Sequence, residues 1–179
     1  IAINNTGGIL VFDLLNLPVQ GGANTRVFDN QITTNNTKNF APAGNIVGTV
    51  PSGTGLMVLA NDNIEIFGNT FNENNSANIL LVSYYITERP FDDPNYDPFP
   101  EQIYIHDNDF RGGGTAPRHR LLLAWHEIAQ VNTPNIVWGG LVAEGNRWCW
   151  GVCLGHIRAA SCVSLNGGVG RGDVRCGAA

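Results

Sequence analysis

The stretch IEIFGNTFNENNS, residues 64–76, decides the fold because its pattern occurs three times in the chain. An apolar alternation leads to a lone asparagine, and one more apolar residue leads to Asn-Asn-Ser. The same order recurs in TRVFDNQITTNNT (25–37) and, with Gly113-Gly114-Thr115 in place of the Asn-Asn corner, in IYIHDNDFRGGGT (103–115). The lone asparagines are Asn30, Asn69 and Asn108, each 39 residues after the one before. A fixed period of this length indicates stacked structural repeats.

Each repeat predicts two short strands joined by a loop of variable length. An apolar run follows the Asn-Asn corner, as in LMVLA (56–60) and NILLVSY (78–84), and an alternating run precedes the lone asparagine. Alternation turns one set of side chains inward and the other outward. The inward set is Val27, Ile64, Ile66, Ile103 and Ile105, and the outward set includes Arg26, Glu65 and Tyr104. Short strands at this spacing predict an all-β fold, a parallel β-helix or solenoid.

The corner asparagines predict ladders of side-chain amides. Asparagine tolerates the left-handed backbone of a tight corner, and its side chain bonds to nearby backbone groups. When corners stack about 4.8 Å apart, their amides can bond from coil to coil. One ladder is predicted at the lone asparagines. A second is predicted at the Asn-Asn corner, with Asn36 and Asn75 as its members.

Composition narrows the classes of partner. The chain is 43% hydrophobic and 14% charged, and its formal net charge is −5. It lacks the basic stripe of a nucleic-acid-binding protein, so no nucleic-acid partner is predicted. No apolar run reaches the roughly 18 residues of a membrane helix, so no membrane span is predicted.

The opening residues IAINNT match the end of a repeat. Ile1 takes the place of Ile32 and Phe71, and Asn4-Asn5-Thr6 takes the place of the later Asn-Asn-Thr/Ser corners. The match predicts that the chain begins inside a repeat and that further coils precede Ile1. The alternative is a short N-terminal edge strand that happens to share the pattern.

Three strings carry a family resemblance, NNTGGILVFDL (4–14), NFAPAGNIVGTVPSGTG (39–55) and DPNYDPFPEQIYIHDNDFRGGG (93–114). They resemble a family of secreted or periplasmic bacterial right-handed parallel β-helix repeat proteins with pectate-lyase-like coils. The resemblance implies an exported protein, and some members of the family are thought to work alongside secreted c-type cytochromes. The wider superfamily includes polysaccharide lyases, hydrolases and uronate epimerases, and the fold alone does not decide among these functions.

Three regions are expected on this basis. Residues 1–115 form the coils, 116–145 form a helical insertion and the last coil, and 146–179 form a Cys-rich C-terminal cap. The coils carry long Pro/Gly-rich or acidic loops at 14–24, 41–55 and 86–101. Loops that project from one side of a solenoid often form its binding face.

The acidic loop 89–101 offers a candidate calcium site. Its carboxylates are Asp92, Asp93, Asp97 and Glu101. Carboxylates this close repel one another unless a cation intervenes, and hard oxygen ligands suit Ca²⁺. The alternative is a stiff solvated loop in which Arg89 supplies the counter-charge. The loop aromatics, Phe91, Tyr96 and Phe99, either cover the end of the solenoid or stack on sugar rings.

The candidate catalytic residues are basic: His106, Arg111, Arg118, His119 and Arg120. A uronate lyase or epimerase needs a base and a positive charge or Ca²⁺ beside the substrate carboxylate. His106 stands where the other repeats have Phe28 and Phe67. A satisfied surface histidine is the alternative for His106, and the APRHR segment (116–120) can equally cap the helix that follows it.

RLLLAWHEIAQ (120–130) breaks the β pattern and predicts an amphipathic helix that packs on the solenoid. The four cysteines, Cys149, Cys153, Cys162 and Cys176, all lie in the C-terminal region. In an exported protein an even number of cysteines predicts two disulfides, and three connectivities remain open. A zinc site with His156 is the alternative, although the spacing is not typical of zinc ligands.

Two functional classes follow, and the sequence does not decide whether the chain is an enzyme. In the first, a secreted or periplasmic β-helix binds or acts on an acidic polysaccharide, with Ca²⁺ as the one cofactor considered. In the second, a non-catalytic scaffold docks a partner protein such as a secreted c-type cytochrome. A cleft lined by arginines, a cation bound by carboxylates and exposed aromatic rings favour the first class. A flat apolar or acidic loop face, with His106 and Arg118 pointing apart, favours the second.

Overall fold

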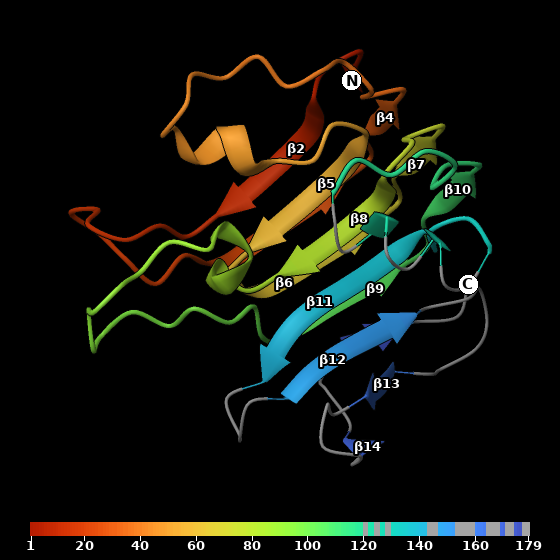
Figure 1. Ribbon diagram of the computed structural model, residues 1–179. Coiled ribbons are helices and arrows are strands. Elements are labelled where there is room, and N and C mark those ends of the chain that lie inside the picture. Colours follow the sequence, from red (N-terminus) through yellow and green to blue (C-terminus); the bar gives the residue numbers. More distant parts are fainter. Residues whose placement is uncertain are drawn as a thin grey trace.

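The computed structural model describes residues 1–119, 122–123, 126–127, 130–142, 147–152, 160–163, 169–170 and 174–176, with side chains as far as residue 139 (Figure 1). The strands are β1 (Ala2–Ile3), β2 (Gly7–Phe12), β3 (Ala23–Phe28), β4 (Gln31–Thr33), β5 (Thr54–Leu59), β6 (Asp62–Phe67), β7 (Thr70–Asn72), β8 (Ala77–Val82), β9 (Ile103–His106), β10 (Asp109–Arg111), β11 (Ile136–Val142), β12 (Arg147–Val152), β13 (Ala160–Val163), β14 (Val169–Gly170) and β15 (Val174–Cys176). Two single-turn 3-10 helices are η1 (Ile46–Thr49) and η2 (Tyr84–Thr87).

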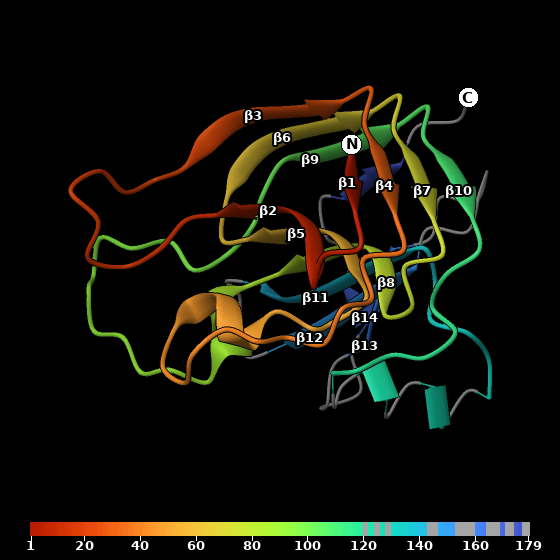
Figure 2. The same ribbon diagram turned by 90° about the horizontal axis from the view of Figure 1, so that it is seen from above.

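Three sheets enclose a shared interior (Figure 2). We call β1, β4, β7 and β10 the corner sheet, and β3, β6, β9 and β15 the open sheet. The wide sheet begins with β2, β5, β8 and β11 and continues into β12, β13 and β14. In all three sheets the coil strands pair in parallel with strands of the next coil. This repeating arrangement of parallel sheets is that of a parallel β-helix, as the sequence predicts.

The coils contain three strands each, where the sequence predicts two. The additional strands are those of the corner sheet, such as β4 and β7, which are only three residues long. Each carries a single buried residue, Ile32 in β4 and Phe71 in β7. One apolar residue shows no alternation, so the sequence pattern cannot reveal a strand this short.

The inner core fills the solenoid with the side chains that the alternation predicts. The inward set is confirmed, because Val27, Ile64, Ile66, Ile103 and Ile105 are all buried. They pack with the inward residues of the wide sheet, among them Leu56 and Leu81. Glu65 remains half-buried at the surface, while Arg26 and Tyr104 are exposed, so the outward set is confirmed as well.

A second core lies outside the wide sheet. β5 and β8 are buried along their whole length, and the long loops with η1 and η2 cover their outer side (Figure 2). Strands that are buried on both faces read as continuous apolar runs, which explains LMVLA and NILLVSY. The loops therefore serve largely as a cover for this sheet. The predicted end-covering or sugar-stacking aromatics, Phe91 and Tyr96, belong to this second core.

The first predicted ladder is confirmed. The side-chain nitrogen of Asn30 donates to the side-chain oxygen of Asn69 at 3.0 Å, and Asn69 donates to Asn108 at 2.9 Å. Backbone amides of Asn30 and Asn69 donate to the same oxygens, both at 3.0 Å. The same side chains also donate back to the previous coil, Asn69 to the backbone oxygen of Val27 and Asn108 to that of Ile66, so several hydrogen bonds join neighbouring coils at this corner.

The second ladder uses Asn35 and Asn74, one residue earlier than predicted. At the N-terminus Ala2 pairs with Ile32 and Asn5 bonds to Asn35, so the predicted match of Ile1 with Ile32 is wrong by one residue. The buried amide ladder joins Asn5, Asn35, Asn74 and Asn78, with Asn35 and Asn74 fully buried. Asn36 and Asn75 form an outer rung, in which the backbone nitrogen of Asn75 donates to the side-chain oxygen of Asn36 at 2.8 Å. Adjacent asparagines look alike in sequence, and only the corner geometry decides which side chain turns inward.

The predicted helix is present where it is described. Leu122, Leu123, His126 and Glu127 are helical, and Leu122 is buried in the second core. Arg120, Leu121, Trp125, Ile128 and Ala129 lie outside the described residues. Within the described part of the chain, no helix is long and apolar enough to cross a membrane.

Candidate binding face

The outer side of the open sheet displays two rows of side chains, and no described element covers it (Figure 2). We call this the outer face, and it consists of Arg26, Phe28, Glu65, Phe67, Tyr104 and His106. The parallel register brings equivalent residues side by side, because positions 39 apart pair between neighbouring coils. One row is Arg26, Glu65 and Tyr104, and the other is Phe28, Phe67 and His106.

The second row is a stack of rings. The ring centroids of Phe28 and Phe67 lie 5.1 Å apart with an interplanar angle of 8°, and those of Phe67 and His106 lie 5.1 Å apart at 1°. Stacked aromatic pairs at this separation add attraction beyond the area they bury. Because the rings stack from strand to strand, their faces cover one another and their edges point to solvent.

Ionic contacts join the two rows. Nε of Arg26 donates to Oε2 of Glu65 at 2.7 Å, and the other oxygen of Glu65 lies 3.2 Å from Nε2 of His106. Nδ1 of His106 lies 2.7 Å from a carboxylate oxygen of Asp107. The Arg26 guanidinium also sits over the rings of Phe67 and Phe28, at 4.9 and 5.5 Å from their centroids. One continuous chain of contacts therefore fixes the face.

The protonation of His106 follows from these contacts. The hydrogen bond to Asp107 raises the pKa of His106 above its ordinary value of 6.5, and the hydrogen bond to Glu65 adds to the effect. The Arg26 hydrogen bond, with that of His106, lowers the pKa of Glu65. Both changes favour the ionised forms. An imidazolium with both nitrogens bonded to carboxylates has no free lone pair, so His106 is poorly suited to act as a base in this arrangement.

The other predicted catalytic residues lie apart from His106. Arg111 is on β10 of the corner sheet, where it bonds to its neighbour Asp109 at 2.7 and 2.6 Å. Arg118 follows that sheet, and its backbone nitrogen donates to the hydroxyl of Ser76 at 3.0 Å. Neither arginine makes a hydrogen bond or ion pair with His106 among the described contacts.

His119 lies at the start of the described helical residues. Burial lowers its pKa, and its backbone oxygen accepts a hydrogen bond from the nitrogen of Leu123 at 2.8 Å. This bond is that of a first helical turn and agrees with the alternative role of the APRHR segment in starting the helix. Arg120 lies outside the described residues, so its predicted role stays a prediction.

The carboxylates of the acidic loop shape turns within the loop. Asp93 accepts a hydrogen bond from the backbone nitrogen of Asn95 at 2.9 Å, and Asp97 accepts one from Phe99 at 3.0 Å. In the described portion of the chain, no group of three or more His, Cys, Asp or Glu is placed to hold a metal ion. The calcium site at Asp92, Asp93, Asp97 and Glu101 stays a prediction.

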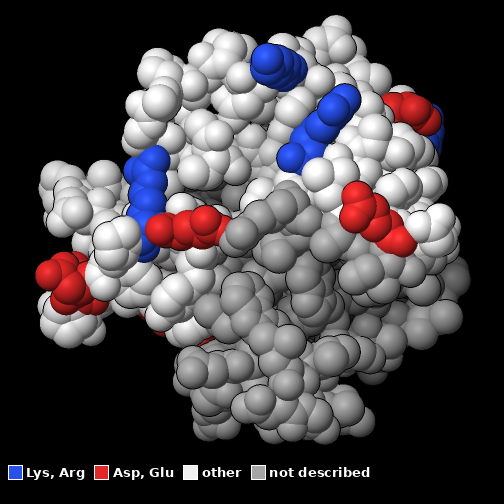
Figure 3. All heavy atoms as spheres, in the orientation of Figure 1, with Lys and Arg blue, Asp and Glu red and all other residues white. Residues whose placement is uncertain are grey.

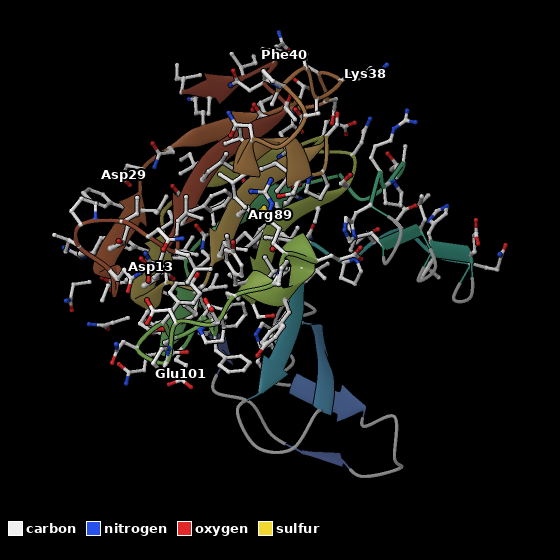
Figure 4. The ribbon with its side chains drawn as sticks, turned by 60° about the vertical axis from the view of Figure 1, so that its left-hand side comes forward. Asp13, Asp29, Lys38, Phe40, Arg89 and Glu101 are labelled. Carbon is white, nitrogen blue, oxygen red and sulfur yellow. The ribbon has the colours of Figure 1, made fainter. Side chains whose placement is uncertain are left out.

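The same loop is fastened to the solenoid by uncharged contacts. The hydroxyl of Tyr96 donates to the backbone oxygen of Asp13 at 2.8 Å, and burial raises the pKa of Tyr96. The Tyr96 ring meets the ring of Tyr84 edge-on, at a centroid distance of 5.4 Å. Arg89, which lies beside η1 and η2 (Figure 4), donates to the backbone oxygen of Gly44 at 2.8 Å. Arg89 thus links two loops through a hydrogen bond to a backbone carbonyl. The sequence analysis instead expects Arg89 to supply the positive charge beside the carboxylates of the acidic loop.

The cysteine predictions lie outside the described side chains. Cys153 is not described, and Cys149, Cys162 and Cys176 are described by their backbone alone. The antiparallel register of β12 and β13 places Cys149 opposite Cys162. His156, the zinc alternative, also lies outside the described residues.

The outer face was only half recognised from the sequence. The alternation identifies which residues point outward, and the replacement of phenylalanine by His106 is visible in the repeat. The ion pair of Arg26 with Glu65 was missed, although these residues are also 39 apart. Equivalent positions of a solenoid lie side by side, so the period itself carries that signal.

Comparisons with known proteins identify no relative of this chain. The chain matches no protein-family model, and no curated protein or solved structure is significantly similar to it.

Proposed function

We propose that the chain is a non-catalytic scaffold that docks a partner protein through the outer face. The observation that carries the proposal is a set of ordered side chains, Arg26, Tyr104 and the ring stack, on a sheet face that no described element covers. Side chains of this kind dominate the binding energy of protein interfaces, where arginine and tyrosine are enriched and lysine is depleted. The side chain of Arg26 is 60% exposed, and Tyr104 is 43% exposed as a whole residue.

Preorganisation supports docking. Binding normally costs about 0.5–1.5 kcal/mol for each long side chain that becomes immobilised. In the outer face that ordering has already taken place, because the ion pairs and the stacked rings hold the side chains before a partner arrives. A parallel sheet with buried asparagine ladders gives these side chains a rigid base.

The separation of the predicted catalytic groups also supports a non-catalytic role. General acid–base catalysis requires the base to reach the reacting proton, and electrostatic catalysis requires cations at the developing charge. His106 is on the open sheet with both nitrogens bonded, whereas Arg111 is on the corner sheet and bonded to Asp109. Among the described contacts, none joins His106 to Arg111 or Arg118.

The charge distribution points the same way. Figure 3 shows the loop-covered side of the wide sheet, away from the outer face, and on that side Lys and Arg are spread among uncharged and acidic residues. An acidic polysaccharide binds best where several cations gather, since each surface ion pair contributes only about 0–1 kcal/mol. A protein partner needs no such concentration of one sign.

The cellular setting is part of the proposal. We place the protein in the secreted or periplasmic space, as the family resemblance and the clustered cysteines imply. The same resemblance implies a right-handed solenoid, which agrees with the strong preference of parallel strand connections for that hand. A secreted c-type cytochrome is one partner that the resemblance implies.

The test immobilises the full chain and exposes it to exported proteins of the source organism. The variant Tyr104→Asp disrupts the outer face, and Gln31→Asp is its control because Gln31 is exposed on the corner sheet. The captured protein is then purified and its affinity for each chain is measured. We expect Tyr104→Asp to weaken binding at least tenfold while Gln31→Asp binds as the wild type does. Equal binding by all three chains would overturn the proposal.

One observation favours the polysaccharide function as a second candidate. Phe40 is 85% exposed, and the exposed Lys38 lies two residues before it, near the same end of the molecule (Figure 4). An exposed ring can stack on a sugar, and an ammonium can pair with a uronate. If this candidate is correct, polygalacturonate will retard the wild-type chain in affinity electrophoresis and Phe40→Ala will remove the retardation. No retardation of the wild-type chain counts against it.

A further inference from the structure

Arg26 is held by one nitrogen and leaves the other two open. Its Nε donates to Glu65 at 2.7 Å, and no described residue forms a hydrogen bond or ion pair with Nη1 or Nη2. The side chain is 60% exposed. A guanidinium presents its donors in a fixed planar fork that matches a carboxylate. The unpartnered pair of nitrogens is therefore half of a bidentate ion pair.

The fork is prevented from rotating freely. The rings of Phe67 and Phe28 lie beneath the guanidinium, at 4.9 and 5.5 Å from its central carbon. Glu65 is itself fixed from its other oxygen by His106. Cation–π contact and the ion pair together restrict Arg26 to a narrow range of orientations.

Arg111 provides the contrast. It is 65% exposed, close to the value for Arg26, but its Nε and Nη2 both bond to the same oxygen of Asp109. Its donors are thus directed at a residue of the chain itself, and no described aromatic ring supports it. The two arginines are similarly exposed. They differ in how many guanidinium nitrogens are already bonded, one in Arg26 and two in Arg111.

We infer that Arg26 is the anchor of the outer face and binds a carboxylate side chain of an acidic segment in the partner protein. The inference rests on the proposed function and deepens it by naming the chemistry of the partner. Nη1 and Nη2 of Arg26 each donate a charge-assisted hydrogen bond to the partner carboxylate. Glu65 holds Nε and keeps the guanidinium in place while these two bonds form.

The surroundings of Arg26 favour a peptide carboxylate. Glu65, which bonds to Arg26, and Asp107, which bonds to His106, are acidic, so the formal charges of these four residues cancel when His106 is protonated. A cluster without net positive charge recognises an anion through the geometry of one fork, and a single carboxylate matches that fork. The edges of the Phe28 and Phe67 rings suit apolar side chains next to a carboxylate. Sugar stacking requires open ring faces, and Phe67 has a ring stacked on both of its faces, Phe28 on one and His106 on the other.

The test is a side-chain ¹⁵N NMR titration of the full chain with hexaglutamate as the probe. The expected result is a saturable shift of the Arg26 guanidinium signals with no comparable shift at Arg111. Arg26→Lys keeps the charge but loses the fork, so the apparent Kd for hexaglutamate should rise about tenfold, the loss of about 1.4 kcal/mol. Arg111→Lys, the matched control, should leave the Kd unchanged. Unchanged amide spectra establish that both variants fold.

Several outcomes would overturn the inference. They are equal shifts at both arginines, an Arg26→Lys chain that binds as well as the wild type, and a preference of Arg26 for inorganic phosphate or trigalacturonate over hexaglutamate. Shifts at the Tyr104 and Phe28 amides without a shift at Arg26 would overturn the role of Arg26 and leave the docking function intact. Failure of the docking function itself appears separately, as equal capture by the Tyr104→Asp and Gln31→Asp chains.

Discussion

The side-chain nitrogen of Asn35 donates to the side-chain oxygen of Asn74 at 3.1 Å, across 39 residues of sequence and with both side chains fully buried. The backbone nitrogen of Asn35 donates to the same oxygen, also at 3.1 Å. Asn74 in turn donates to the backbone oxygen of Ile32 at 3.0 Å and to Asn78 at 2.9 Å. The 39-residue period places Asn35 and Asn74 side by side, and the hydrogen bonds between them hold the neighbouring coils together.

Replacing Asn74 by alanine should destabilise the protein strongly. The substitution removes the acceptor of two buried Asn35 donors, the backbone nitrogen and one side-chain N–H, and each such group costs about 1–3 kcal/mol. We expect the free energy of unfolding in urea to fall by about 3 kcal/mol or more. Asn36→Ala is the control, because Asn36 is only half-buried, and it should cost about 1 kcal/mol. Equal losses in the two variants would contradict the inner position of the ladder.

Replacing Gly55 by alanine should also destabilise the fold, through lack of space. An added Cβ would lie 2.5 Å from the backbone oxygen of Asn78 and 2.9 Å from the side-chain nitrogen of Asn74. Backbone cannot move aside easily, so we expect a loss of about 1–3 kcal/mol in urea unfolding. Gly48→Ala is the matched control, since its added Cβ would lie 3.6 Å from the nearest atom, the backbone oxygen of Pro42. A neutral Gly55→Ala chain would show that the coils are further apart than described.

His106 should make stability fall at alkaline pH. Its folded-state pKa is raised above 6.5, so its contribution is complete below that value and is lost as the pH rises through the folded-state pKa. His106→Phe keeps a ring in the stack, as in Phe28 and Phe67, and removes the titration. Thermal unfolding at pH 6 and pH 9 should therefore show a larger drop in Tm for the wild type than for the variant. Parallel drops would refute the role of the imidazolium.

Asp62→Asn should stabilise the protein at neutral pH. Burial raises the pKa of Asp62 above 3.8, and Asp97 and Asp13 add to the shift, while the hydrogen bond from the Glu101 backbone opposes it. The folded state therefore holds the proton more tightly, and stability decreases as the pH rises from 3.8 through the folded-state pKa. An asparagine oxygen can still accept the bond from Glu101. The variant should have the higher Tm at pH 7, and an advantage that persists below pH 3.8 would contradict this explanation.

The period and the alternation were enough to predict the fold, because both report on contacts between equivalent residues. Successive side chains of a strand point to opposite faces, so the alternation within one strand is enough to show that Val27 and Ile66 turn inward. The choice between Asn35 and Asn36 depends on the corner backbone, which no pattern encodes. The cover over the wide sheet depends on where long loops fold back. Tyr96 reaches the backbone of Asp13, a residue 83 positions away, and composition gives no sign of that contact.

The candidate site was harder to predict because its members are ordinary surface residues taken singly. Arg26 and Glu65 gain meaning only when the 39-residue register places them in one row. The repeat shows that His106 replaces a phenylalanine. Its two ring nitrogens bond to Asp107 and Glu65, which a phenylalanine cannot do. The basic residues on and after β10 were selected by residue type, because the sequence does not show which sheet presents each side chain.

The most direct test of the docking face is site-specific photo-cross-linking in the source organism. Benzoylphenylalanine is placed at Tyr104 in one chain and at Gln31 in the other, since both positions are exposed and they lie on different sheets. The account predicts one discrete protein adduct from position 104 that is lost when Arg26 is changed to lysine, and none from position 31. Adducts of equal yield from both positions, or no protein adduct from position 104, would contradict it.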